Sequence, residues 1–294
     1  VEEAGIRCVL GLICNDQGAS VPRADLLAAG ETFLRSARAG SLVHPSLAIS
    51  IPEAATDAML ADTSALARAH GAVFQVHVNE HLASVERSLV ARGLRPIEHL
   101  DHVGALGPQT LLAHATLATP YELNMIAESG TALSYNPVAS AWKGNAVANA
   151  PLWAALGIRF GIGTDSNILI SAADELKALE YIQRLVHRGR NILSPPGAST
   201  GRRLFDAAFD GGNRALGLDG RGIAPGNLAD LVTLAPAHPS LALAKGDGLL
   251  DAFIFAGAGI DGVWRAGRQI VSGGRQVAKG QILARYAAAL APLA

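Results

Sequence analysis

The chain has 294 residues, of which 50% are hydrophobic and 17% are charged, and its formal net charge is −1 at pH 7. This length suits one large α/β domain with a small appendage, and the near-neutral charge excludes the basic field of a nucleic-acid-binding protein. Cys8 and Cys14 have no metal or redox spacing, and neither a membrane-length apolar run nor a signal peptide is recognisable. We therefore expect a cytoplasmic protein with a small-molecule substrate and no nucleic-acid or membrane partner.

Buried strands and amphipathic helices alternate along the chain up to Gly217. Strands are predicted to begin near residues 6, 48, 73, 110, 132 and 160. Helices are predicted over 25–39, 56–69, 84–92, 98–103, 119–130, 149–156, 171–187 and 201–216. Residues 136–149, between two of these elements, are expected to form a loop. Six strand–helix units are two fewer than a closed (β/α)8 barrel needs, and an open doubly wound sheet is the alternative, which no glycine-rich phosphate loop supports.

The pattern changes after Gly217. Residues 222–234 are a turn-rich entry into a strand, and short strand candidates separated by glycines occur at 251–255, 262–268 and 269–271. A final apolar helix is expected over 286–293. We therefore predict two domains: an incomplete barrel over residues 1–217, and a β-sandwich portion with a C-terminal helix over residues 218–294.

Ionisable residues close or follow three of the predicted strands. His77 and Glu80 follow the first, His114 ends the second, and Asp165 ends the apolar run 160–164. Each has an ordinary structural interpretation, because a histidine can bond a neighbouring loop, a glutamate can be solvated, and an aspartate can cap the next helix. Active sites of barrels lie at the carboxyl ends of strands, so the four residues together favour a functional site.

These residue types suit metal-dependent hydrolysis. A neutral imidazole is a common zinc ligand, and zinc lowers the pKa of a bound water to about 7. We expect Asp165 to bind the metal and accept a proton, Glu80 to shuttle protons, and His114 to polarise the water or the developing oxyanion. Trp142 and Lys143, in the predicted loop, either contact substrate or belong to a surface loop.

Five segments carry a resemblance to a known family. They are His77–Glu80, the strand ending at His114, Asn136–Ser140, Gly161–Ser166 and Gly226–Val232, and in this order they resemble the amidohydrolase superfamily, in its branch of deaminases and chlorohydrolases. The resemblance implies an α/β fold, a (β/α)8 TIM-type barrel that lacks its first strands here, with part of a small β-sandwich at the C-terminus.

The resemblance also implies a site. One Zn²⁺ or Fe²⁺ ion would be held by His77 and Asp165, with Glu80, His114 and Asp165 as the catalytic residues. Substrate contacts are expected from Asn136, Trp142 and Ser166. The protein is expected to be a homo-oligomer, a dimer.

The motif that supplies the family's first two metal ligands is missing. It is a His-x-His at the end of the first barrel strand, and no such motif occurs in this sequence. We therefore expect the chain to be a fragment of a longer parent or to have lost its amino-terminal part. A non-catalytic barrel scaffold is the alternative to an enzyme.

Further segments resemble formimidoylglutamate deiminases, which hydrolyse a formimino C–N bond; they include Asp174–Leu176, Gln183–Leu185 and Gly211–Gly217. In contrast, the loop after Asn136 is closer to the aromatic-base deaminases, Leu117 stands where the deiminases tend to have histidine, and 51–56 lacks the arginine expected to hold a glutamate carboxylate. The resemblance implies a zinc-dependent deaminase or deiminase that releases ammonia. An aminohydrolase of guanine, cytosine or a chlorotriazine is the alternative enzyme.

Overall fold

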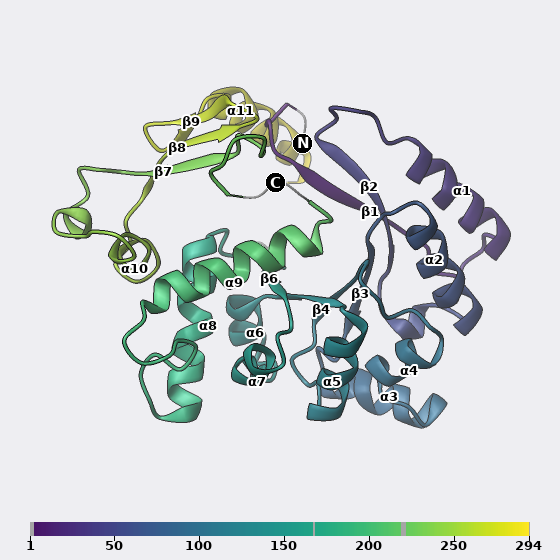
Figure 1. The fold of residues 1–294 in the computed structure, drawn as a ribbon. Coiled ribbons are helices and arrows are strands. Elements are labelled where there is room, and N and C mark those ends of the chain that lie inside the picture. The colour runs from purple at the N-terminus through teal and green to yellow at the C-terminus, as the bar shows by residue number, and fades with distance from the viewer. Residues whose placement is uncertain (1–2, 167, 219–221, 294) are drawn as a thin grey trace.

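The computed structural model describes residues 3–166, 168–218 and 222–293. Six parallel strands pair in chain order to form the main sheet (Figure 1). They are β1 (Cys8–Ile13), β2 (Val43–Ile49), β3 (Phe74–Val78), β4 (Thr110–His114), β5 (Ala132–Tyr135) and β6 (Phe160–Ile162). Barrel strands follow chain order, whereas a doubly wound sheet reverses direction at a switch point. The predicted α/β fold with six barrel-type strands is confirmed, and the doubly wound alternative is wrong.

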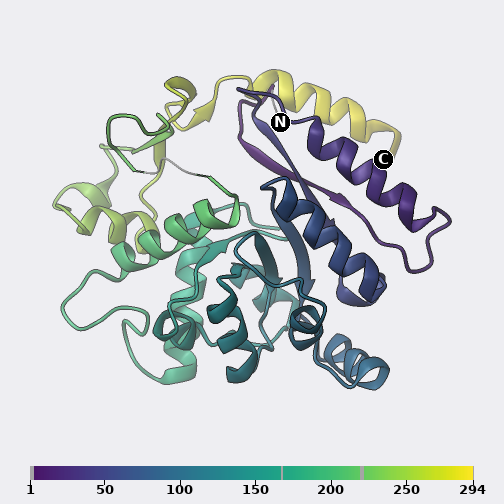
Figure 2. The same ribbon diagram turned by 45° about the vertical axis from the view of Figure 1, so that its right-hand side comes forward.

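The helices around this sheet are α1 (Arg23–Arg35), the 3-10 turn η1 (Pro52–Ala54), α2 (Asp57–Ala69), α3 (Leu82–Arg92), α4 (Pro96–His102), α5 (Pro120–Ser129), α6 (Pro137–Lys143), α7 (Ala150–Ala155), α8 (Ala172–His187) and α9 (Thr200–Ala215). Helices α1 to α7 lie between the strands in sequence and along the convex side of the curved sheet, whereas α8 and α9 follow β6 and α9 packs against β6 and β5 from the other side (Figures 1 and 2). The core lies between the sheet and these helices, where Leu47, Phe74 and Leu112 from the strands are buried with Met59 and Leu123 from the helices.

The start of α5 shows how local sequence sets these boundaries. The Thr119 hydroxyl accepts a hydrogen bond from the Glu122 amide, and the Glu122 carboxylate accepts one from the Thr119 amide at 2.8 Å. Pro120 occupies the first turn, where its missing N–H costs nothing, and Gly130 ends the helix at φ +71°. The predicted helix start and end are both confirmed.

The loop predicted over 136–149 is wrong. Residues Pro137–Lys143 form α6, with proline in the first turn and Gly144 as a left-handed C-cap at φ +70°. The Val138 amide donates to Glu175 Oε2 at 2.9 Å, so a buried carboxylate from α8 stabilises the start of this short helix. A seven-residue helix has too few turns for a clear apolar period, and this long-range contact replaces it.

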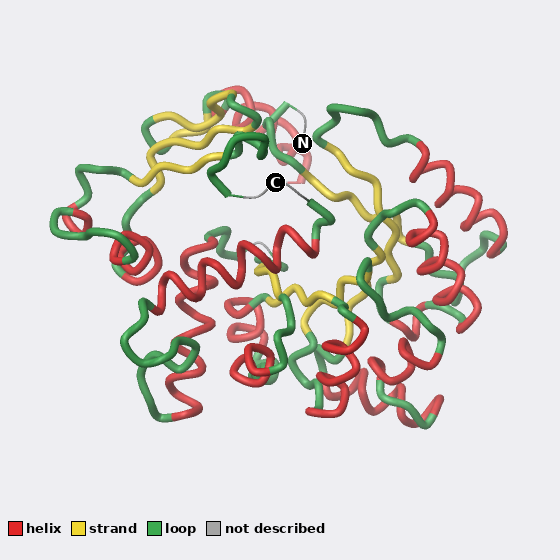
Figure 3. The backbone as a smooth tube through the Cα atoms, viewed as in Figure 1, coloured by secondary structure: helices red, strands yellow, loops and turns green. Residues whose placement is uncertain are grey.

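A second, antiparallel sheet follows in the order β10–β9–β8–β7 (Figure 3). Its strands are β7 (Leu231–Leu234), β8 (Ile260–Arg265), β9 (Arg268–Ser272) and β10 (Arg275–Gln276), and the elements around them are η2 (Pro239–Leu241), α10 (Gly248–Phe255), α11 (Lys279–Leu290) and η3 (Ala291–Leu293). The strand predicted at 251–255 is wrong. This short apolar run belongs to α10, which packs against α8 and α9 and buries Ile254 completely, and periodicity cannot separate a buried helix from a strand over so few residues.

Polar contacts tie the small sheet to the start of the chain. Arg7 Nε lies 3.1 Å from Asp230 Oδ2, and Arg265 Nε donates to the Gly5 carbonyl at 3.1 Å. Within the described residues, none of the helices has the length and apolar character needed to cross a bilayer.

The buried Glu175 gives the fold a testable dependence on pH. Its side chain is 1% exposed, and burial raises its pKa to about 6, although the Val138 amide opposes the shift. The folded-state pKa of Glu175 exceeds the unfolded value, so the fold favours the protonated carboxyl group. The stability that this preference gives is present at acid pH and is lost as pH rises through about 6. Glu175→Gln should therefore stabilise the protein about 2 kcal/mol more at pH 7.5 than at pH 4, as measured by urea unfolding.

Asp174→Asn is the matched control for this prediction. The hydrogen bond from Lys177 lowers the pKa of Asp174, so ionised Asp174 stabilises the fold at neutral pH and Asp174→Asn should lose that contribution there. Removal of its repulsion with Glu175 offsets only part of this loss, so the change should be opposite in sign to that of Glu175→Gln. An identical pH profile of stability in wild type and Glu175→Gln would contradict the prediction.

Candidate functional site

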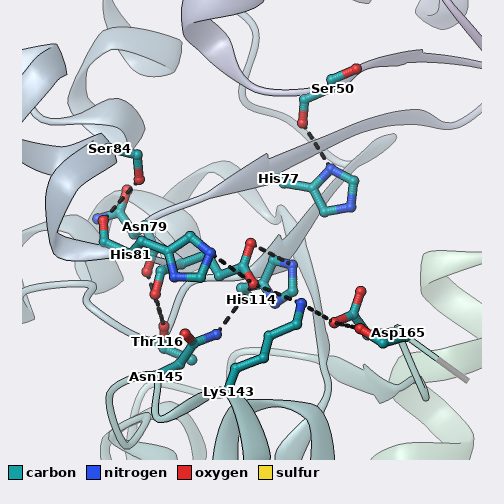
Figure 4. A network of polar contacts seen from close by, with 12 residues as sticks. Ser50, His77, Asn79, His81, Ser84, His114, Thr116, Lys143, Asn145 and Asp165 are labelled. Carbon is teal, nitrogen blue, oxygen red and sulfur yellow. Dashed lines mark hydrogen bonds and ion pairs between the residues drawn. The ribbon is translucent and has the colours of Figure 1, made fainter. Parts of the chain in front are cut away.

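The carboxyl ends of β3, β4 and β6 bring the four predicted ionisable residues to one rim of the sheet, and Figure 4 labels three of them, His77, His114 and Asp165. The rings of His77 and His114 lie 5.3 Å apart, centroid to centroid, at the ends of the neighbouring strands β3 and β4. Glu80 Oε2 lies 3.4 Å from His114 Nε2.

Lys143 joins this group from the last turn of α6. Its Nζ lies 3.1 Å from Glu80 Oε1 and also pairs with Asp165 Oδ2, so one ammonium bridges two carboxylates. Asn145 Nδ2 donates to Glu80 Oε1 at 3.2 Å, and Ser166 Oγ donates to Asp165 Oδ2 at 3.1 Å. Figure 4 shows the lysine side chain reaching toward Asp165.

The charges of this network stabilise one another. The hydrogen bond to Asp165, followed by that to Glu80, raises the pKa of Lys143. Burial by itself would raise the pKa of Asp165, but hydrogen bonds from Lys143 and Ser166 outweigh it and lower the pKa. Burial of Glu80 is likewise outweighed, by His114 and Lys143, so its pKa also falls. At neutral pH the network therefore holds two carboxylates and one ammonium.

His114 behaves differently because its side chain is buried. It is 1% exposed, and burial lowers its pKa to about 4, against the opposing effect of Glu80. The imidazole is therefore neutral at pH 7. Its Nδ1 has no hydrogen-bond partner within the described residues.

His77 has one nitrogen committed and one free. Its Nδ1 lies 2.7 Å from the Ser50 carbonyl oxygen, which can only accept, so the proton is assigned to Nδ1. The lone pair is then on Nε2. A backbone carbonyl that fixes the tautomer in this way is the usual support of a metal-binding histidine.

The donor types suit zinc or iron, but this chain supplies only part of a site. His77 Nε2 and Asp165 are imidazole and carboxylate donors, and the Lys143 ammonium lies where a cation neutralises the carboxylates. Over residues 3–166, 168–218 and 222–293, no group of three or more His, Cys, Asp or Glu side chains is arranged to hold a metal ion. Zinc sites use three or four protein ligands, so the two donors here fill only some positions.

The backbone around the site is strained. Asn79, His114, Ala115 and Asp165 have φ values of +49°, +72°, +51° and +48°. Non-glycine residues in this left-handed region cost of order 1–3 kcal/mol each and cluster at functional sites. All of these positions lie at or just beyond strand ends, where the backbone turns side chains toward the rim.

The three predicted substrate contacts differ in position. Ser166 is exposed and belongs to the network through Asp165. Asn136 is 6% exposed, and we assign its side-chain amide the orientation in which the nitrogen donates to the carbonyl oxygens of Tyr135 and Gly163, at 3.2 and 3.0 Å. Trp142 is 52% exposed on α6. The structure therefore brings Ser166 into the network, whereas Asn136 is engaged with the backbone at the ends of β5 and β6.

Sequence analysis missed Ser50 and Asn145, and left Lys143 undecided. Each acts through a partner more than twenty residues away, so no local pattern marks it. The sequence signal that could have indicated Lys143 and Asn145 was the polar run Lys143-Gly144-Asn145, in a chain where the predicted carboxylates Glu80 and Asp165 had no assigned cationic partner.

The chain is similar in sequence to a family of hydrolases and to several deaminases. A sequence model of the amidohydrolase family matches residues 1–270. A 5'-deoxyadenosine deaminase of Methanothermobacter thermautotrophicus is 29% identical over 279 residues, which cover 93% of this chain and 64% of that protein. A formimidoylglutamate deiminase of Pseudomonas aeruginosa is 38% identical over 203 residues, which cover 68% of this chain and 45% of that protein. The chain thus spans only about half to two thirds of these relatives.

Solved structures share the fold over nearly the whole chain. An amidohydrolase from Brucella melitensis superposes with a TM-score of 0.87 at 33% identity, covering 99% of this chain and 67% of that one. An adenosine deaminase from Xanthomonas campestris with bound zinc has a TM-score of 0.86 at 22% identity, covering 97% and 65%. The first expectation of fold, a TIM-type barrel with an appended sheet, is confirmed by these neighbours.

Proposed function

Because the chain belongs to the amidohydrolase family, which its sequence matches over residues 1–270, we propose that the protein hydrolyses a C–N bond of a small molecule and releases ammonia. The observation that carries the proposal is the Glu80–Lys143–Asp165 network beside the neutral His114, at the carboxyl ends of the strands. Such sites in barrels carry the chemistry. Ionised, partly buried carboxylates that share one lysine at this rim favour an enzyme over a scaffold.

His77 Nε2 and Asp165 are the residues that would hold a zinc ion, one per site, with iron as the other candidate. Zinc, when bound, acidifies a water molecule so that a nucleophile forms near neutral pH. The structure supports this assignment through the donor types and through the Ser50 carbonyl that fixes the His77 tautomer.

Glu80 and His114 would carry the proton chemistry. The ionised Glu80 carboxylate accepts a proton from the attacking water and passes it to the departing nitrogen, which must be protonated to leave as ammonia. Lys143 and Asn145 fix the orientation of one Glu80 oxygen. The neutral His114 ring lies next to the other Glu80 oxygen, Oε2. It would donate a hydrogen bond to the oxygen of the reacting substrate, where negative charge develops.

Two substrate classes have support from relatives. The 38% identity to a formimidoylglutamate deiminase favours an amidine-like substrate. Other relatives match more of the chain at lower identity and favour an amino-substituted purine. One of them is a 5-methylthioadenosine/S-adenosylhomocysteine deaminase of Archaeoglobus fulgidus, at 30% identity over 83% of this chain. The reaction is common to both, because water adds to a carbon that carries nitrogen and ammonia departs.

A direct assay tests the proposed function. The protein supplied with Zn²⁺ should release ammonia from at least one of N-formimino-glutamate, 5'-deoxyadenosine, guanine and an amino-substituted triazine, measured by a coupled glutamate dehydrogenase assay. Treatment with a chelator should remove at least about 90% of this activity, and Zn²⁺ should restore it, since zinc-dependent hydrolysis has no substitute nucleophile. Absence of ammonia from every class would refute the proposal.

A further inference from the structure

Glu53 is a carboxylate without a partner, close to the candidate site. It lies in η1, just after the carboxyl end of β2, and both of its carboxylate oxygens are buried with no hydrogen-bond partner within the described residues. An ionised carboxylate shielded from water in this way is unfavourable unless a donor or cation meets it. The arrangement therefore suits a ligand that brings the missing positive charge.

The space beside Glu53 connects it to the candidate site. A cavity of about 100 Å³ is lined by Glu53 together with His77, Glu80 and His81. A wider, outer cavity of about 660 Å³ is lined by Glu53 and by Glu86, on the outer side of α3. Arg87 and Glu53 border both cavities, so Glu53 lies between the solvent-facing space and the residues of the network.

The neighbouring charges leave Glu53 available. Glu80 is already paired with Lys143, whereas no ion pair within 4.0 Å links Arg87 to Glu53 in the described part of the chain. The outer cavity carries charges of both signs, because Arg87 and Arg92 line it together with Glu53 and Glu86. A preference for a positive group at the inner cavity therefore depends on the unpartnered oxygens of Glu53 and not on a general negative field.

We propose that Glu53 is a specificity-determining residue that binds a positively charged group of the substrate, an ammonium, guanidinium or amidinium, in the cavity beside His77 and Glu80. The inference rests on the proposed function, because it places this group next to the hydrolytic site. It also accounts for the missing arginine in residues 51–56. A carboxylate there repels the acidic side chain of a glutamate derivative and favours a cationic one.

Binding of an isosteric pair of probes tests the charge preference. In NMR titrations at low salt, the protein should bind methylguanidinium about tenfold more tightly than the neutral N-methylurea, because a charge-assisted hydrogen bond is about twice as strong as a neutral one. Glu53→Gln should remove this preference, and Glu53→Asp should keep part of it. Circular dichroism of each variant establishes that it is folded.

Glu86→Gln is the matched control, since it removes the same charge from the outer cavity alone. It should keep most of the preference. Equal binding of the two probes by wild type, or an unchanged preference in folded Glu53→Gln, would overturn the inference. The titration requires neither metal nor turnover, so ammonia release without a charge preference would sink this inference and leave the proposed function standing.

Discussion

Asp165→Asn should lower ammonia release at least about 10³-fold while the protein remains folded. The substitution removes the negative charge that pairs with Lys143 and that would bind the metal, and an amide is a poor replacement in both roles. It also frees Lys143 to pair with Glu80 alone, which would hold the proton-shuttling carboxylate more tightly. Loss of the metal donor and disruption of the Glu80–Lys143–Asp165 network should therefore both lower the rate of ammonia release.

The fold should tolerate this change for two reasons. Asp165 adopts φ +48°, and asparagine is among the few residues that accept left-handed backbone without large strain. Its side chain is 22% exposed, so loss of the ion pair with Lys143 should cost no more than about 1 kcal/mol. Alanine would add backbone strain at this position and confuse the two effects.

Asp174→Asn is the control for Asp165→Asn. It removes one partly exposed carboxylate from the start of α8, where the partner is Lys177 rather than Lys143. Initial rates of ammonia release and urea unfolding should be measured for both variants and wild type. Turnover at the wild-type rate in Asp165→Asn would remove Asp165 from the mechanism, and an unfolded variant would contradict the tolerance argued above.

Gly211→Ala should destabilise the protein by about 3 kcal/mol or more, a larger effect on stability than the other substitutions discussed. A Cβ at Gly211 would lie 1.9 Å from the Phe160 carbonyl oxygen and 2.3 Å from its carbon, which are backbone atoms that cannot rotate away. Helix α9 would have to move away from β6. Because β6 leads into Asp165, a weaker α9–β6 contact should reduce activity as well as stability.

Gly212→Ala provides an internal control one residue away on the same helix. Its Cβ would meet nothing within 4 Å, so alanine should stabilise α9 by up to about 1 kcal/mol through its higher helix propensity. Urea unfolding of both variants separates the two effects. Similar stabilities for Gly211→Ala and Gly212→Ala would show that close approach of α9 to β6 is not required.

The sequence predicted the positions of the strand ends and therefore most of the candidate site. An apolar run followed by an ionisable residue can be recognised in the sequence alone, because a buried parallel strand carries its polar groups mainly at its ends. His114 ends β4, His77 is the last residue but one of β3, and Glu80 and Asp165 lie just beyond β3 and β6. The structure brings these four residues to one rim. Capping at Thr119 was equally legible, since its hydrogen bonds join residues three apart.

Tertiary structure alone decided which partners these residues have. Lys143 lies 63 and 22 positions from the carboxylates it joins, Ser50 lies 27 from His77, and Glu175 lies 37 from the helix start it stabilises. Short elements such as α6 and α10 have the same origin, because they are too brief for a period and form through packing against α8. Local patterns specify where a chain turns and which face is apolar. Which distant side chains then meet depends on strand order and register, which only the folded sheet sets.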